Sequence, residues 1–290
     1  MAKTVNEAFS IYLSRLTPSV AERAKASSHR ASIEVKLEDR FGLYRMYESG
    51  SWRHGTGVSG RSDVDYFISL KSPKPRLGTS VLTAVKNTMQ ERFPNTYIHI
   101  SRPAVVLEFG GGYERVELIP AYPSLTLGGG EMRYDIPGVT TEWMESTPKA
   151  HLLYVTASNK RKGIEGGVKQ LARLVKAWKY QCNVPISSFY LEMRAAQYMN
   201  GESLIFYPID LKRLLTSLLN HSLADMNDPT GMTGRIRPCS SDANHREALS
   251  KLKTAVGRAG NALEARESGR ETDAFYWWDR LFDGDFPAYY

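Results

Sequence analysis

The hydrophobic pattern of the first half of the chain changes from helical to strand-like. Apolar residues recur at helical spacing over Asn6–Leu16, and Pro18 ends or restarts this helix. A second, more polar helix is predicted over Val20–Phe41, and short β-rich runs then follow, with a helix over Ser80–Arg92 after the second of them. The runs are Leu43–Tyr47, Val64–Leu70, Tyr97–Ile100, Val105–Phe109 and Arg115–Ile119. Gly110–Gly112 predicts a hairpin turn between the last two runs, and one sheet with helices packed on it is the simplest interpretation.

Beyond about Met144 the pattern becomes helical and stays so to the end. Over Gly167–Tyr180 the apolar side chains form a single stripe. Further helices are predicted over Ser188–Met199, Asp210–Leu219, Glu247–Ala265 and Thr272–Phe282. The segment Ala224–Asp242, rich in turn-forming residues, is predicted to be a long loop. The predicted fold class is therefore α+β, with an α/β domain over residues 1–145, including the N-terminal helices, and an all-helical domain over residues 146–290.

Composition narrows the class of protein without selecting a function. The 290 residues are 42% hydrophobic, enough for a packed core, which excludes disordered and collagen-like chains. Lys and Arg number 38 against 31 Asp and Glu, and this net charge of +7 favours polyanionic partners such as nucleic acid or nucleotides. An uncommitted basic surface explains the same excess equally well.

Cysteine usage and the lack of long apolar runs bear on the compartment. Cys182 and Cys239 lie far apart without further cysteines, which argues against a zinc site and a disulfide framework. The sequence has no apolar stretch of 18 residues and no N-terminal run of signal-peptide type. We therefore expect a soluble, cytoplasmic protein with no membrane partner.

A glycine-rich string imitates a dinucleotide-binding motif. Gly55, Gly57 and Gly60 match G-x-G-x-x-G, which binds pyrophosphate only where it joins a strand to a helix. Here a strand-like segment, Ser62–Ile68, follows the glycines, and no Gly-Lys-Ser/Thr is present nearby. The dinucleotide fold and the P-loop are therefore both rejected, and the glycines are interpreted as a tight loop beside a ligand.

A stronger set of chemical groups surrounds this loop. Asp63 and Asp65 flank Val64 on a predicted strand, so both carboxylates project from one face. Two such carboxylates repel each other unless a cation lies between them, and hard oxygen ligands suit Mg²⁺. Upstream, Gly50 allows close backbone approach, and the Ser51 hydroxyl with nearby amides is suited to holding a triphosphate.

A third acid on a neighbouring strand completes the pattern. Glu117 stands between Val116 and Leu118, so its side chain points away from these apolar neighbours. A third acid on an adjacent strand would complete a two-metal site. The competing interpretation, an exposed strand edge with solvated acids, explains an isolated Asp-x-Asp better than it explains this combination.

Gly-Ser, a spacer, Asp-x-Asp and a later strand acid resemble the signature of the polymerase-β-like nucleotidyltransferases. In detail the chain is similar to the bacterial cyclic-oligonucleotide synthases related to cyclic GMP-AMP synthase and oligoadenylate synthase, the CD-NTases. The resemblance covers nearly the whole chain. It is carried by segments 50–65, Val116–Ala121, Leu171–Trp178, Ser187–Glu192 and 277–287.

This resemblance implies roles for individual residues. Asp63, Asp65 and Glu117 would be the catalytic acids and would bind two Mg²⁺ ions, with Mn²⁺ as an alternative. Gly50 and Ser51 would hold the nucleotide. Lys176 and Ser188 map onto phosphate-binding residues, and Phe189 onto a ring that stacks on the base. Each of the last three has a plainer interpretation: a solvated basic stripe shared with Lys169 and Arg173, a helix N-cap, and a core aromatic.

One residue departs from the family pattern. The third acid is usually Asp, and Glu117 is one methylene longer, so the ion or the strand must shift by about 1 Å, which can cost ~10²-fold in rate. We interpret the site as working, with a pseudoenzyme as the alternative.

The expected function is synthesis of a cyclic di- or trinucleotide second messenger from ribonucleoside triphosphates, with release of pyrophosphate. ATP is the expected first substrate, and the sequence does not specify the second base. The resemblance implies a role in anti-phage defence, with a separate effector that binds the product. Two alternatives stay open: a catalytically silent nucleotide or RNA sensor, and a linear nucleotidyltransferase acting on RNA or a small acceptor. Nucleic acid is thus a partner that the sequence allows without requiring.

Overall fold

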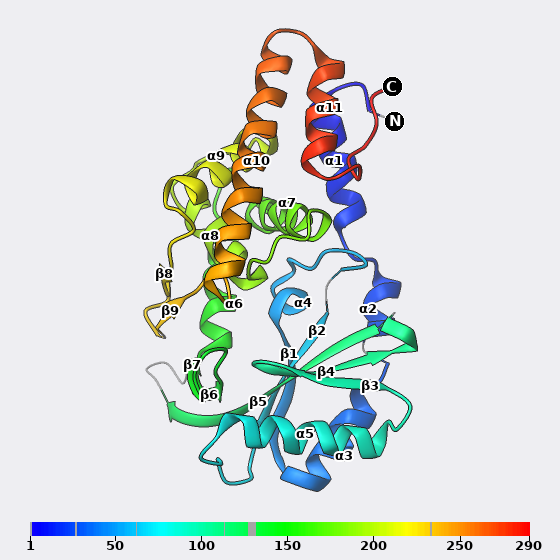
Figure 1. Cartoon of the computed structure of the whole chain (residues 1–290), viewed down its shortest axis with the longest axis vertical. Coiled ribbons are helices and arrows are strands. Elements are labelled where there is room, and N and C mark those ends of the chain that lie inside the picture. The colour runs from blue at the N-terminus through cyan, green and yellow to red at the C-terminus, as the bar shows by residue number, and fades with distance from the viewer. Residues whose placement is uncertain (1, 27, 62, 113, 127–131, 233) are drawn as a thin grey trace.

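The computed structural model describes residues 2–26, 28–61, 63–112, 114–126, 132–232 and 234–290. A sheet with helices forms the lower part of Figure 1, and a group of helices forms the upper part. The two ends of the chain lie side by side at the top, where Ala2 forms a parallel β-bridge with Tyr289 and its carbonyl accepts a hydrogen bond from the Tyr290 amide (3.0 Å).

The sheet has seven strands in the order β1-β2-β5-β4-β3, and β6 and β7 extend it from the far part of β5. Among the strands that the structure describes in this sheet, β2 and β5 run parallel, with Asp65 opposite Glu117, and the other pairs of neighbours are antiparallel. Ser62, predicted to begin β2, lies outside the described residues. The strands are β1 (Leu43–Ser49), β2 (Val64–Leu70), β3 (Tyr97–Ser101), β4 (Ala104–Phe109), β5 (Glu114–Thr126), β6 (Met132–Pro137) and β7 (Trp143–Ser146). This confirms the five predicted strands and the turn at Gly110–Gly112.

Strands β6 and β7 were not predicted, and β5 is longer than expected. Pro120 and Pro123 in β5 are typical of a strand end, because proline cannot donate to a ladder. In the structure they lie where β5 leaves β4, whose last pair is Val105 with Leu118, and begins to pair with β6 at Tyr122. The strand therefore continues by changing its partner, which a local pattern does not reveal.

Two helices cover one face of the sheet, α3 (Arg30–Phe41) and α5 (Gly78–Arg92), and their apolar side chains pack on the strands. The single helix predicted over Val20–Phe41 is wrong: α2 (Val20–Ala26) ends before α3 begins. The His29 ring between them stacks on Phe109 at 3.7 Å, and its Nδ1 lies 3.0 Å from the Glu114 carboxylate. These contacts with the sheet redirect the chain between the helices.

The upper part consists of helices α6 (Pro148–Asn159), α7 (Gly167–Gln181), α8 (Ser188–Met199), α9 (Tyr207–Asn220), α10 (Asp242–Glu267) and α11 (Glu271–Leu281). The loop predicted over Ala224–Asp242 contains a two-stranded pair, β8 (Met226–Asn227) with β9 (Arg235–Ile236), so this part is not entirely helical. The α+β class is confirmed. No helix within the described residues is both long and apolar enough to cross a membrane.

The first helix belongs with the helical part, contrary to the predicted grouping of the N-terminal helices with the sheet. The apolar side chains of α1 (Val5–Leu16) join the core formed by α7 to α11. The Phe9 ring meets Trp278 edge-on at 4.9 Å, and the Tyr12 hydroxyl donates to Asp285 (3.0 Å). Helix α1 therefore ties the start of the chain to its end. The domain boundary near residue 145 stays a prediction.

Candidate active site

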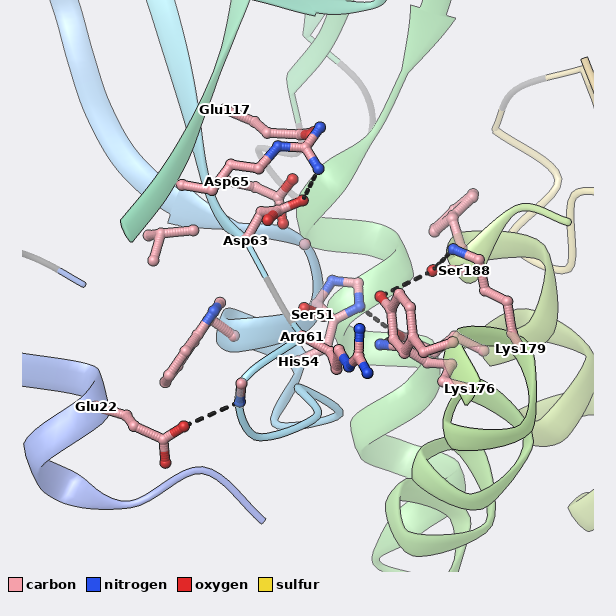
Figure 2. A pocket seen from close by; sticks show the side chains of 18 of the residues that line it. Glu22, Ser51, His54, Arg61, Asp63, Asp65, Glu117, Lys176, Lys179 and Ser188 are labelled. Carbon is pink, nitrogen blue, oxygen red and sulfur yellow. Dashed lines mark hydrogen bonds and ion pairs between the residues drawn. The ribbon is translucent and has the colours of Figure 1, made fainter. Parts of the chain in front are cut away.

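A cavity of about 720 Å³ lies between the sheet and the helical part. Figure 2 shows its two walls: Asp63, Asp65 and Glu117 on one side, and Lys176, Lys179 and Ser188 on the other. The acids come from β2, β5 and the residue before β2, and the basic wall comes from α7 and the first residue of α8. All eight residues expected in the site line this cavity, which has an acidic wall and a basic wall. They are Gly50, Ser51, Asp63, Asp65, Glu117, Lys176, Ser188 and Phe189.

Gly50 brings the chain next to the second carboxylate. It follows Ser49, the last residue of β1, has a left-handed φ of +57°, and begins the short helix α4 (Gly50–His54). A Cβ at this position would overlap the Asp65 carboxylate, and the backbone amide of Ser51 hydrogen-bonds that group. Glycine is required here both by conformation and by the close approach.

Replacing Gly50 with alanine should therefore displace Asp65. Left-handed backbone costs a non-glycine residue about 1–2 kcal/mol, and the overlap adds to this. We expect Gly50→Ala to lower both the melting temperature and the rate of any nucleotide transfer. Gly60→Ala is the matched control, since Gly60 also has positive φ (+65°) but nothing lies within 4 Å of its Cβ. Equal loss of activity in both variants would contradict a role for the approach to Asp65.

The three acids lie close enough to perturb one another. Burial, the largest cause, and the charge of Glu117, the second largest, raise the pKa of Asp63 to about 7. The same two causes, with the charge of Asp63, raise the pKa of Asp65 well above its usual value. Grouped carboxylates of this kind are unfavourable without a cation.

The donor set fits divalent cations, although the side chains do not enclose an ion site. Within the described residues, no three His, Cys, Asp or Glu groups are arranged to hold a metal ion directly. Instead, the Arg115 guanidinium lies 3.3 Å from Asp63 Oδ2 and 3.2 Å from Glu117 Oε1. Three clustered hard oxygen groups suit Mg²⁺ or Mn²⁺ in chemistry, so the fit is one of donor type and charge.

Lys176 lines the cavity, but its ammonium group is bonded to other groups of the protein. Its side chain is fully buried, and Nζ donates to the backbone carbonyl of Thr56 (2.9 Å). The carboxylate of Glu192 lies 3.8 Å away and is bonded to His54 and to the Thr56 hydroxyl. The Lys176 ammonium thus joins α7 and α8 to the glycine loop, a contact that differs from the direct phosphate contact implied by the resemblance.

Arg173 likewise holds the loop. Its guanidinium donates to the backbone carbonyls of Gly55 (2.6 Å) and Gly57 (3.0 Å). The segment connects α4 to strand β2, which agrees with rejecting the dinucleotide motif. Because Arg173 and Lys176 bind loop carbonyls, the basic stripe of α7 positions the backbone that carries the site.

Lys179 is a functional candidate that the sequence reasoning missed. Its Nζ donates to the Ser188 hydroxyl (2.7 Å), and both side chains line the cavity. Burial, the largest cause, and the positive charge of Lys176, the second largest, lower the pKa of Lys179 to about 8. The available signal was its place three residues after Lys176 on the same helix. The N-cap of α8 is Ser187, which leaves the Ser188 hydroxyl directed at Lys179.

Phe189 lies on the cavity surface instead of in the core. Its side chain is 36% exposed and lines the cavity, while the next residues of α8, Tyr190 and Leu191, are fully buried. The ring packs edge-on against His151 at 5.0 Å, and His151 Nε2 lies 2.9 Å from Asp228. The Phe189 ring is therefore held by His151 and partly exposed in the cavity.

Comparison with known proteins relates the sequence of this chain to a family. A family model described as Second Messenger Oligonucleotide or Dinucleotide Synthetase domain matches residues 3–159, which include all three acids. A probable cyclic nucleotide synthase of Bacillus cereus is 22% identical over 218 residues, or 72% of this chain. The match spans 63% of that relative's length.

Solved structures share the fold over nearly the whole chain. Escherichia coli CdnC, solved with ATP, aligns with a TM-score of 0.76 and 19% identity over 98% of this chain and 99% of its own. Bradyrhizobium diazoefficiens CdnG with GTP gives 0.69 and 13%, covering 97% and 98%. Vibrio cholerae DncV with GTP gives 0.65 and 15%, covering 96% and 80%. At these identities the similarity establishes the fold.

Proposed function

Because the chain belongs to the family of second messenger oligonucleotide or dinucleotide synthetase domains, we propose that it joins ribonucleoside triphosphates into a cyclic di- or trinucleotide. The observation that carries this proposal is the cavity itself, in which three strand acids face Lys179 and Ser188 across the space for a ligand. Such a division suits a triphosphate with its cations on one wall and its phosphates reaching the other.

The reaction is a nucleotidyl transfer. A ribose hydroxyl oxygen bonds to the α-phosphorus of a triphosphate, the bond from that phosphorus to the β-phosphate oxygen breaks, and pyrophosphate leaves while the hydroxyl proton passes to solvent. Asp63, Asp65 and Glu117 would hold two Mg²⁺ ions, or Mn²⁺. Bound ions of this kind stabilise the charge on the entering and leaving oxygens. A last transfer within the linear product, which is the second for a dinucleotide and the third for a trinucleotide, closes the ring and releases another pyrophosphate.

The protein's own groups bind and orient the substrate. Gly50 keeps the backbone near Asp65, and Ser51, whose amide holds the Asp65 carboxylate, presents its hydroxyl at the start of α4. Lys179 and Ser188 bind phosphate oxygens, since charge-assisted hydrogen bonds are the stronger class. Phe189 stacks on the base, and Lys176 holds the Thr56 carbonyl of the loop that follows α4, the helix on which Ser51 lies. Positioning of this kind supplies much of the rate in phosphoryl transfer.

Lys179→Ala should weaken binding of the triphosphate. Loss of a hydrogen bond from a charged group costs about 1.5–3 kcal/mol, so KM for the triphosphate should rise by about 10- to 100-fold. Because the pKa of Lys179 is about 8, kcat/KM of the wild type should fall as pH rises through 8, where the positive charge is lost. The alanine variant should lack this fall. Steady-state kinetics over pH 6–10 measure both effects.

Two further variants complete that test. Lys179→Arg keeps its charge at every pH of the series, so its kcat/KM should lose the fall near pH 8 without the full loss of affinity. Lys253→Ala removes an exposed lysine of α10 outside the cavity lining and should leave KM unchanged. An unchanged KM in Lys179→Ala would remove Lys179 from the phosphate site.

Identifying the product tests the proposed function as a whole. The protein is incubated with the four ribonucleoside triphosphates and Mg²⁺ or Mn²⁺, and the products are analysed by mass spectrometry. We expect pyrophosphate and a cyclic di- or trinucleotide. Linear products alone would support transfer to an acceptor instead. Salt-sensitive binding of RNA without turnover under any metal would support the silent sensor.

We also propose the setting of this reaction. The enzyme would act in the cytoplasm, where its triphosphate substrates are present. The cyclic product would bind a separate effector as part of a defence against phage, which is the role that the family resemblance implies. Expression of the wild type and of an Asp63→Asn variant in phage-challenged bacteria, together with the genes adjacent to it, would measure this role by plaque counts. Equal plaque counts would contradict it.

A further inference from the structure

One guanidinium bridges two of the three carboxylates. Arg115 and Glu117 are two residues apart on β5 and therefore point to the same face. Strand β2 runs parallel to β5 with Val64 opposite Val116, so Asp63 comes next to Arg115. The distances are 3.3 Å from Arg115 Nη1 to Asp63 Oδ2 and 3.2 Å from Nη2 to Glu117 Oε1.

Arg115 is only partly satisfied in this position. Both distances exceed the 2.7–2.9 Å of good charge-assisted bonds. Its Nε is buried and has no hydrogen-bond partner within the part of the chain that the structure describes. The side chain is 38% exposed, so solvent already reaches part of it. A loosely held, partly solvated guanidinium on a flexible stem can move away from the acids at small cost.

The oxygens that face Arg115 belong to the residues to which the proposed function assigns the cations. A divalent ion bound by Asp63 and Glu117 would lie within a few ångströms of the guanidinium, and the two positive charges would repel each other. Without an ion, the same guanidinium offsets the repulsion among the acids. Because of their charge and position, the Arg115 guanidinium and the divalent ion would exclude each other from Asp63 and Glu117.

We propose that Arg115 is an internal counterion of the acidic wall, which competes with the divalent cation for Asp63 and Glu117 and withdraws when that ion binds. The inference rests on the proposed function, because it takes the acids to be the metal site. Its consequence is that Arg115 weakens metal binding while it stabilises the metal-free protein. By linkage, the two effects have the same origin and should change together.

Binding of Mn²⁺ to the nucleotide-free protein, followed by electron paramagnetic resonance, tests this without any enzymatic activity. Arg115→Gln should bind Mn²⁺ about 10-fold more tightly than the wild type, within the usual range of coupling between sites. In EDTA its melting temperature should fall, and Mn²⁺ should raise that temperature by more than in the wild type. Arg115→Lys keeps the charge but cannot bridge two carboxylates, so its Mn²⁺ affinity should lie between those of the wild type and of Arg115→Gln.

Arg61→Gln is the matched control. Arg61 lines the same cavity, and its guanidinium bonds Gln181 (3.3 Å). Arg61→Gln removes the same charge as Arg115→Gln. If both variants gained the same Mn²⁺ affinity, the gain would be a general charge effect, and the proposal would be overturned. Unchanged or weaker affinity in Arg115→Gln would also overturn it. If that variant does not fold, Arg115→Lys decides, because binding no tighter than the wild type overturns the competition.

The failure of the proposed function gives a different result. If the double variant Asp63→Asn and Asp65→Asn binds Mn²⁺ as the wild type does, the acids are not the metal site at all. If the double variant loses Mn²⁺ but Arg115→Gln matches the wild type, only the competition is wrong.

Discussion

The double variant Asp63→Asn and Asp65→Asn should lose nucleotide transfer by more than about 10³-fold. The two carboxylates supply two of the three negative charges of the acidic wall, and electrostatic stabilisation is usually the largest contribution to such reactions. Asparagine keeps the volume of each side chain, so packing in the cavity is preserved. Release of pyrophosphate from radiolabelled triphosphates measures the loss.

Stability separates this result from misfolding. Burial raises the pKa of both carboxyls, so their charged forms are less favourable in the folded protein than in the unfolded chain. This penalty is complete above the folded pKa, shrinks as pH falls from the folded toward the unfolded value, and is absent below the unfolded pKa. Neutral asparagines should therefore leave the melting temperature in EDTA at pH 8 unchanged or higher. The exposed Asp39→Asn on α3 should change neither activity nor stability. Retained transfer in the double variant would remove these acids from catalysis.

Lys176→Met should be the most destabilising of the substitutions considered. It would leave the buried Glu192 carboxylate without its nearby ammonium and the Thr56 carbonyl without its donor. Breaking one partner of a buried charged network costs about 3–5 kcal/mol. For a chain of this size, the melting temperature should fall by roughly 10 °C. Differential scanning calorimetry at pH 7 measures the change.

Two comparisons isolate the buried charge. Adding Glu192→Gln to Lys176→Met removes the carboxylate charge that has lost its ammonium and should recover part of the loss, whereas further additive loss would contradict the pairing. Lys71→Met breaks the exposed pair with Glu38, at 3.6 Å, and should cost about 1 kcal/mol or less.

The same network predicts an acid-sensitive contribution to stability. Burial would raise the pKa of Glu192, but His54, Lys176 and Thr56 outweigh it and lower the pKa from 4.5 to about 2. A lowered carboxyl pKa stabilises the fold above its unfolded value, and this contribution is lost as pH falls from about 4.5 toward 2. Glu192→Gln should therefore show a weaker dependence of unfolding free energy on pH in this window. Urea denaturation between pH 2 and 5 measures it.

The sequence by itself determined the elements whose pattern is local and the residues whose chemistry is unusual. The alternation around Val64 and Val116 predicted that Asp63, Asp65 and Glu117 project from strands, because side chains on a strand alternate faces whatever the partner. In the structure Asp65 and Glu117 lie on β2 and β5, and Asp63 directly precedes β2. The apolar stripe of α7 and the glycine-rich turn after β4 could likewise be predicted from the local sequence pattern. These features need only neighbours within a few residues to be recognised.

The tertiary structure alone decided the contacts between distant segments. Helix α1 packs against α11 because both ends of the chain bury aromatic faces in one core, which no local pattern encodes. Strand β5 passes its prolines because its partner changes there. Lys176 reaches a loop carbonyl and leaves Lys179 facing Ser188, while Arg115 enters the acidic wall. Residue type gave the charges of the site, and the packing of helix against sheet decided which charges meet.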